Sequence, residues 1–186
     1  DAAFFAIYVG QESRDSAGLA KATAFANDQL RKFKSYTENY KGAAIAYNSK
    51  DLLSNKREGT ISVVLAIENG YVFQKNISLV KHFADMGVVA VTLCHNKNND
   101  ICDASMDTAP EHHGLSPFGV EVVKEMNRLK LIIDVSHAST ESLFDILEVS
   151  TLPIIASHSG VWNIKNHNRN LKDNEIKAIA AKGGLI

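Results

Sequence analysis

Apolar residues gather in short runs along this chain, and polar segments with helical spacing separate them. Four of these runs end at an acidic or histidine side chain, and they cover residues 61–68, 88–95, 131–137 and 152–158. Short runs rich in Val and Ile that alternate with helical segments are typical of βα units, whose buried strands form a parallel sheet. The pattern therefore predicts an α/β fold in which each run is a strand.

The rest of the chain continues the alternation of predicted strands and helices. A further strand is predicted at residues 2–9, and residues 183–186 have the pattern of the beginning of another. Helix signals lie between the strands, because apolar residues recur at helical spacing and Ser, Asn or Asp precedes several of these segments. Helices are expected over residues 16–36, after Asn48, from Asn76 to Gly87, from Ser116-Pro117, from Ser139 or Thr140, and from Asp173.

The ends of the four runs carry candidate metal ligands. In βα barrels the carboxyl ends of the strands meet at one face, where the active site lies. Zinc takes imidazole nitrogen and carboxylate oxygen, so Glu68, His137 and His158 form a candidate ligand set. His95 ends its run in the same way, and spacing alone would make it a third imidazole ligand. These groups would satisfy one zinc ion, whereas two ions would require further anionic ligands.

Two loops carry further candidate chemistry. Arg169 lies in the polar loop that follows His158, where its guanidinium could bind a substrate carboxylate, although an isolated Arg is equally compatible with a solvated surface. The loop at residues 96–115 is unusually long for a compact domain, and we expect it to be functional. Ser157 lies outside a G-x-S-x-G motif, so a serine hydrolase is not indicated.

Composition narrows the class of protein. The chain has 186 residues, of which 45% are hydrophobic and 22% charged, and its net charge is −1. This length supports a single domain over residues 1–186, and the charge gives no field that would attract nucleic acid. No apolar run approaches the roughly 18 residues that indicate a membrane span. Two cysteines are too few for a disulfide scaffold. Compartment and oligomeric state are not indicated, and a homodimer is compatible with the sequence.

Several segments together resemble the membrane (renal) dipeptidase family of zinc peptidases. They are AIENG at 66–70, VTLCHNKNND at 91–100, GLSPFG at 114–119, VVKEMNRLKLIIDVSH at 122–137, PIIASHS at 153–159 and NRN at 168–170. The resemblance runs through essentially the whole chain. It implies a (β/α)8 TIM-type barrel of the amidohydrolase kind with two zinc ions. It also implies hydrolysis of dipeptides, including those with a D-residue at the C-terminal position.

The resemblance assigns a role to each candidate residue. Glu68 would be the carboxylate that bridges two zinc ions, and His137 and His158 would ligate the second ion. His95 would contact the scissile carbonyl without binding metal, and Arg169 would bind the substrate carboxylate. The chain departs from the family pattern at E-N-G, where E-G-G is usual, and at L-C-H, where L-T-H is usual.

Two functional elements of the family pattern fall outside the sequence. The H-x-D pair that holds the first zinc would precede Asp1, and a late aspartate that binds the substrate amine would follow Ile186. A closed barrel of this kind typically has about 250 residues. We therefore expect a barrel truncated at both ends, with about six βα units and the start of a seventh.

These observations predict zinc-dependent hydrolysis of dipeptides by a metal-activated hydroxide. One alternative is an amidohydrolase that acts on another small amide or a lactam. The other is a non-catalytic binding barrel that has lost a functional zinc pair. The presence of H-x-D before Asp1 would favour the enzyme, and its absence from the full gene would favour the binding protein.

Overall fold

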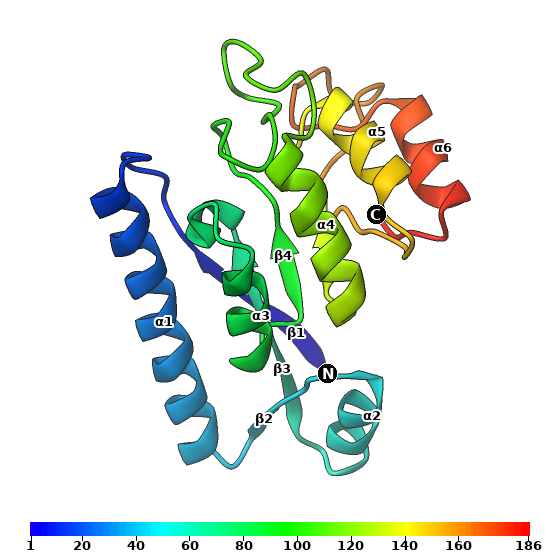
Figure 1. Ribbon diagram of the computed structural model, residues 1–186. Coiled ribbons are helices and arrows are strands. Elements are labelled where there is room, and N and C mark those ends of the chain that lie inside the picture. Colours follow the sequence, from blue (N-terminus) through cyan, green and yellow to red (C-terminus); the bar gives the residue numbers. More distant parts are fainter.

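The computed structural model describes residues 1–186 and has an α/β architecture with parallel strands (Figure 1). The strands are β1 (Ala2–Tyr8), β2 (Ala43–Ile45), β3 (Ile61–Glu68), β4 (Ala90–Thr92) and β5 (Ile132–Asp134). The helices are α1 (Ser16–Asn39), α2 (Ser49–Arg57), α3 (Ser78–Asp85), α4 (Pro117–Leu129), α5 (Thr140–Val149) and α6 (Asp173–Ala181), with a 3₁₀ turn at Gly70–Phe73. The predicted fold class is therefore confirmed.

The sheet has the order β1-β3-β4-β5, and β2 pairs with the first residues of β3. Single parallel bridges continue this order beyond β5, from Asp134 to Ile155 and from Ile155 to Leu185. The expected strands at 152–158 and 183–186 are thus reduced to isolated bridges. Pro153 has no N–H to donate to a ladder, which is one reason why pairing there is confined to residues 154–156.

Strands β4 and β5 are also shorter than predicted. The chain leaves the sheet after Thr92 and after Asp134, so His95 and His137 lie in the loops that follow rather than on the strands themselves. His137 has a φ of 76°, which no regular strand residue adopts. The apolar runs continue past the strand ends because their last residues, such as Leu93 and Val135, are buried under these loops.

The predicted helices are present, with one correction at a cap. Ser116 and Ser139 accept hydrogen bonds from the backbone N–H groups of Gly119 and Ser142, as N-cap residues do. Asn76 does not cap α3: the N-cap position is Ile77, although Asn76 Oδ1 accepts from the N–H of Ser78 at 3.1 Å.

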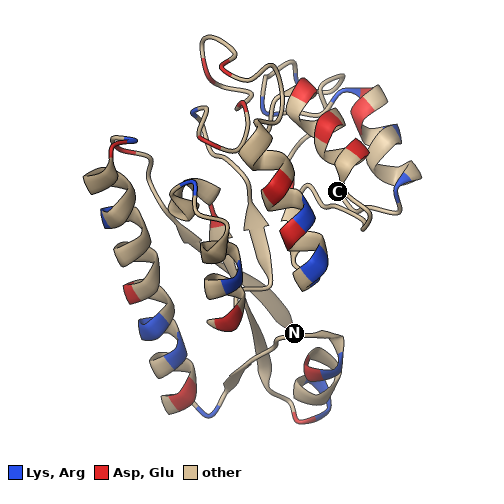
Figure 2. Ribbon diagram, in the orientation of Figure 1, with Lys and Arg blue, Asp and Glu red and all other residues tan.

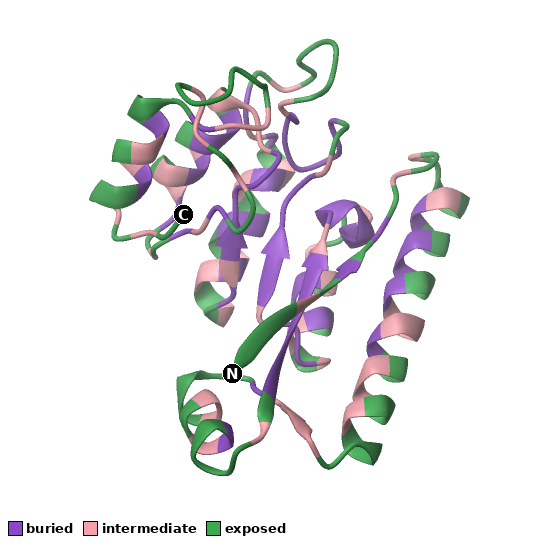
Figure 3. Cartoon of the chain, turned by 180° about the vertical axis from the view of Figure 1, so that it is seen from behind, coloured by how far each residue is buried: buried purple, intermediate pink, exposed green.

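One apolar core lies between the sheet and the helices. It contains 33 buried residues, and helices α3 to α6 each pack on the next along the sheet. Charged residues of both signs, Lys and Arg as well as Asp and Glu, are scattered over the helices and loops (Figure 2). β3 is buried over most of its length, whereas the first half of β1 is exposed, and Phe4 is 50% exposed (Figure 3). None of the helices combines the length and apolar character that crossing a membrane requires.

Candidate metal centre

The register of the sheet brings one row of side chains to the same level. Tyr8 pairs with Glu68, Glu68 with Thr92, and Thr92 with Asp134. Side chains in register on neighbouring parallel strands point to the same face. The row therefore lies at the carboxyl ends of four adjacent strands, where the loops that carry the histidines begin.

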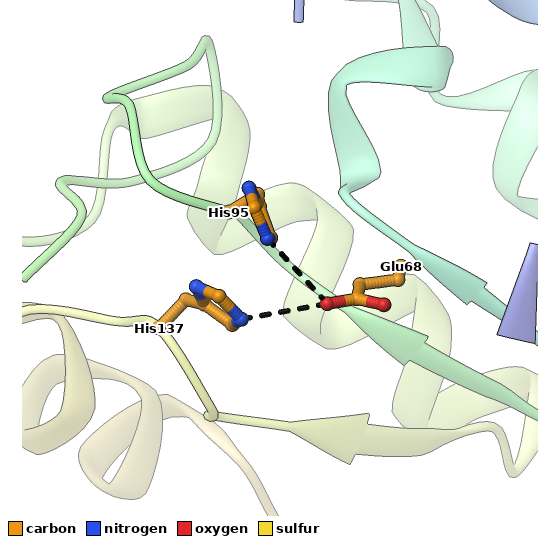
Figure 4. Close-up of side chains that lie close together, drawn as sticks. All are labelled: Glu68, His95 and His137. Atoms are coloured by element: carbon orange, nitrogen blue, oxygen red, sulfur yellow. Dashed lines mark ion pairs between the residues drawn. The ribbon is translucent and has the colours of Figure 1, made fainter. Parts of the chain in front are cut away.

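Three imidazoles meet the carboxylate of Glu68. The distances to Glu68 Oε1 are 3.4 Å from His137 Nε2, 3.5 Å from His158 Nε2 and 3.7 Å from His95 Nε2. His95 and His137 point toward Glu68 from the loops after β4 and β5 (Figure 4). All four side chains predicted from the ends of the apolar runs are thus brought together.

Distances alone do not separate a ligand from a catalytic group within this set. Ligand atoms of Glu68, His95 and His137 all lie within 4.8 Å of one another, which is a spacing suited to a metal ion. His158 Nε2 lies 2.9 Å from His137 Nε2, so it belongs to the same cluster. The assignment of His137 and His158 as ligands, with His95 as a non-ligand, stays a prediction.

The protonation states suit metal binding. Interaction with the His137 imidazole is the main cause that lowers the pKa of Glu68 below its ordinary range, even though burial acts in the opposite direction. Burial is the main cause that lowers the pKa of His95 and that of His137. At neutral pH these groups are therefore a carboxylate and neutral imidazoles, which are the forms that bind metal. This donor set fits zinc, which takes imidazole nitrogen and carboxylate oxygen.

Two non-glycine residues with positive φ adjoin or belong to the centre. His137 has a φ of 76°, and Asn69, directly after Glu68, has a φ of 91°. Residues with a Cβ seldom adopt such angles, and where they do the position often belongs to a functional site. Asn69 is fully buried, donates to Val9 O at 3.0 Å and accepts from the N–H of Tyr71 at 3.2 Å. The Asn of E-N-G therefore supplies hydrogen bonds at a position whose backbone favours glycine.

Each histidine has a partner on its other ring nitrogen. His137 Nδ1 lies 3.1 Å from Asn96 Oδ1, and His158 Nδ1 lies 2.7 Å from Ser157 Oγ. His95 Nδ1 lies 3.5 Å from the hydroxyl of Tyr8, whose ring packs against it. Sequence reasoning did not identify these partners. The only available signal was that Asn96 and Ser157 adjoin candidate histidines in the sequence.

Asp134 lies beneath the centre in the register row. It is 4% exposed and accepts four hydrogen bonds: from the hydroxyls of Thr92 and Ser157, and from the N–H groups of Ser136 and Ser157. Burial acts to raise its pKa, but these hydrogen bonds lower it below the ordinary range. Asp134 is therefore an ionised, fully hydrogen-bonded acceptor at neutral pH.

A cavity of about 450 Å³ adjoins the centre at His137. Its wall includes Arg169, Asn168 and Trp162, from the loop that follows His158. The guanidinium of Arg169 donates to His158 O at 3.2 Å, and burial lowers the pKa of Arg169. The structure thus places a partly desolvated cation on a cavity that opens beside the imidazoles.

The long loop at residues 96–115 forms another part of the cavity wall and is held by buried polar groups. The carboxylate of Asp103, 2% exposed, accepts from the N–H groups of Glu111, His112 and Gly114. Asn99 is fully buried and donates to Asn69 Oδ1 at 3.1 Å and to Leu93 O at 2.9 Å. The loop is therefore tied to the residue that follows Glu68.

Comparison with known proteins identifies the family. The profile of membrane dipeptidases, peptidase family M19, matches residues 1–186. The chain belongs to the membrane dipeptidase family. The resemblance read from the sequence motifs is thereby confirmed.

Individual relatives agree with this membership. Dipeptidase tcpJ of Claviceps purpurea is 36% identical over 142 residues, which is 76% of this chain and 33% of that protein. An uncharacterized dipeptidase of Schizosaccharomyces pombe is 36% identical over 126 residues, 68% of this chain and 31% of that protein. The chain thus spans about a third of the length of these curated relatives.

Solved structures match nearly the whole chain. The crystal structure of the probable dipeptidase PvdM from Pseudomonas aeruginosa superposes with a TM-score of 0.92 at 28% identity, covering 99% of this chain and 49% of that one. An amidohydrolase from the same organism superposes with a TM-score of 0.82 at 28% identity, covering 99% and 53%. The membrane dipeptidase family fold therefore accounts for the arrangement of all the strands and helices described above.

Proposed function

We propose that the protein to which this chain belongs is a zinc-dependent dipeptidase and that the centre around Glu68 is its metal site. The observation that carries the proposal is the convergence of three Nε2 atoms on one carboxylate oxygen, at 3.4, 3.5 and 3.7 Å. Family membership supports the reaction, since the named relatives are dipeptidases.

Glu68, His137 and His158 would hold the metal. Zinc bound there would lower the pKa of a bound water to about 7 and so would supply hydroxide at neutral pH. The carboxylate of Glu68 has a second oxygen with which it could contact a second ion. Two ions per protein are the expectation.

His95 and Arg169 would act on the substrate. His95 Nε2 faces the same position as the ligands, from where it can donate to the oxygen of the scissile carbonyl. Such a donor is most effective when charge develops on that oxygen. Arg169, on the wall of the adjoining cavity, would bind the carboxylate of a dipeptide and orient it toward His95.

Metal analysis combined with a substrate panel tests the proposal. After zinc reconstitution and removal of free metal, elemental analysis of the full-length protein should find close to two zinc equivalents. The same preparation should hydrolyse unblocked dipeptides and leave N-acylated amides and lactams intact. A protein that retains no zinc would contradict the metal site, and a zinc-loaded protein that prefers lactams would contradict the substrate class.

A further inference from the structure

We propose that Asp134 and Ser157 are positioning residues that hold the proton of the His158 imidazole on Nδ1, so that Nε2 presents its lone pair to the metal centre. The proposal rests on the proposed metal site and extends it to two residues that touch neither metal nor substrate. It follows from counting donors and acceptors along a chain of three side chains.

The first link is the carboxylate of Asp134. Its Oδ1 accepts from the N–H groups of Ser136 and Ser157, each at 3.0 Å. Its Oδ2 accepts from the hydroxyls of Thr92 at 2.7 Å and Ser157 at 2.6 Å. An ionised carboxylate can only accept hydrogen bonds, so both hydroxyls must donate to it.

The second link is the hydroxyl of Ser157. A serine hydroxyl has a single hydrogen, which here is directed to Asp134, so toward any other partner its oxygen acts as an acceptor. His158 Nδ1 lies 2.7 Å from that oxygen and must therefore donate. A neutral imidazole that carries its hydrogen on Nδ1 has its lone pair on Nε2.

The third link is the position of Nε2. His158 Nε2 lies 3.5 Å from Glu68 Oε1 and 2.9 Å from His137 Nε2. His137 Nδ1 faces the amide oxygen of Asn96 at 3.1 Å, which gives His137 the same tautomer. Two lone pairs and a carboxylate then face one position, an arrangement that a bound cation stabilises. Hydrogen bonds to the far nitrogen of a ligating histidine fix its tautomer and orientation.

Asp134→Asn tests the direction of this chain, because it replaces one acceptor oxygen by an NH₂ donor without changing the shape of the side chain. The Asn carbonyl can take the place of Oδ1 and keep both backbone N–H donors. Its NH₂ then takes the place of Oδ2 and donates to Ser157, whose hydrogen becomes free to donate to His158 Nδ1. The proton of His158 is thereby moved to Nε2, the atom that faces the metal centre.

Histidine ¹⁵N–¹H correlation spectra of the metal-free, full-length protein at about pH 8 report the tautomer directly, with the His158 signals assigned by their loss in His158→Gln. We expect the Nδ1–H form in the wild type and the Nε2–H form in Asp134→Asn. The zinc dissociation constant, measured by competition with a chromophoric chelator, should rise roughly 10–100-fold in Asp134→Asn. Ser157→Ala should show a smaller loss, because it removes the link without reversing it.

Two variants serve as matched controls. Thr92→Val removes the other hydroxyl on Asp134 Oδ2 and should leave the His158 tautomer and zinc affinity close to wild type. Ser157→Thr keeps the hydroxyl at an exposed position and should restore what Ser157→Ala loses. An Nε2–H form of His158 in the wild type would overturn the inference, and so would an unchanged tautomer and affinity in Asp134→Asn. A wild-type protein that binds no zinc would instead overturn the proposed function, while the spectra still decide the tautomer.

Discussion

His95 Nε2 lies 3.7 Å from Glu68 Oε1, nearly as close as His137 Nε2 at 3.4 Å. Geometry thus presents His95 as an equal member of the centre, whereas family resemblance makes it a group that contacts substrate. The two roles predict different effects of substituting His95. Loss of a ligand would release metal, whereas loss of a hydrogen-bond donor to the substrate would slow turnover.

For His95→Ala we expect zinc content to be retained and kcat to fall roughly 10²–10³-fold, the cost of losing one preorganised donor to a developing oxyanion. His137→Ala and His158→Ala should lose zinc. Zinc stoichiometry measured beside turnover in all three variants separates the roles. Loss of metal from His95→Ala to the same degree as from the other two would make His95 a ligand.

Arg169→Ala should weaken transition-state binding by about 2–5 kcal/mol, the scale for truncating one partner of a buried charged contact. The measurement is kcat/KM for a dipeptide and for its C-terminal amide. Amidation should impair the wild type far more than the variant. Lys172→Ala is the matched control, since Lys172 lines the same cavity and bonds Thr140. Equal effects of amidation in wild type and Arg169→Ala would show that Arg169 does not bind the carboxylate.

Asn69→Gly and Asn69→Ala should separate backbone strain from hydrogen bonding. Both variants lose the bonds to Val9 and Tyr71, but only Ala retains a Cβ at a φ of 91°. We expect Ala to be less stable than Gly by about 1–3 kcal/mol, the cost of holding an L-residue in a sparsely populated backbone region. Urea unfolding at neutral pH gives this difference. Equal stabilities would mean that the backbone relaxes at this position.

Asp100 should contribute a pH-dependent part of the stability. Burial acts to raise its pKa, but the hydrogen bonds and charges of Arg14 and Lys75 lower it below the ordinary value of about 3.9. Because the folded pKa is depressed, the stabilisation is present above about pH 4 and is lost as pH falls through the folded pKa.

Asp100→Asn should therefore lower the free energy of unfolding at pH 7 by about 1.5–3 kcal/mol, the range for hydrogen bonds to charged groups. Its unfolding free energy should also depend less on pH below about 4 than that of the wild type. Glu125→Gln is the control, since Glu125 pairs with Arg128 on the surface of α4 and such pairs contribute little. Parallel pH profiles for wild type and Asp100→Asn would contradict the role.

Sequence patterns predicted the elements whose signals are local. The run of residues 61–68 forms a strand, as its apolar and β-branched residues predict. Ser116-Pro117 begins a helix, because Ser is favoured at the N-cap position and Pro at the first helical position. Residues 152–158 show the limit. An apolar run predicts burial, and Ile154 is indeed fully buried, but only neighbouring segments decide whether a ladder forms.

The candidate site divides in the same way. Glu68, His95, His137 and His158 could be found because each ends an apolar run, and the structure brings all four together. Nothing in the sequence selects Asn96, Ser157 or Asp134 as members of the site. Their roles depend on which ring nitrogen or hydroxyl each of them faces in the folded protein. Hydrogen-bond partners are set by tertiary geometry, and no spacing rule encodes them.

The register row from Tyr8 through Glu68 and Thr92 to Asp134 has a consequence for how this protein can be altered. Successive side chains of a strand point to opposite faces of the sheet, so every second residue faces the same side. A substitution within residues 61–67 changes packing, but insertion of one residue there would turn Glu68 away from the histidines. Two inserted residues would restore its face and move it along the strand by roughly 7 Å. The metal centre therefore depends on the exact number of strand residues that precede Glu68. Insertions and deletions are tolerable only in the loops between strands.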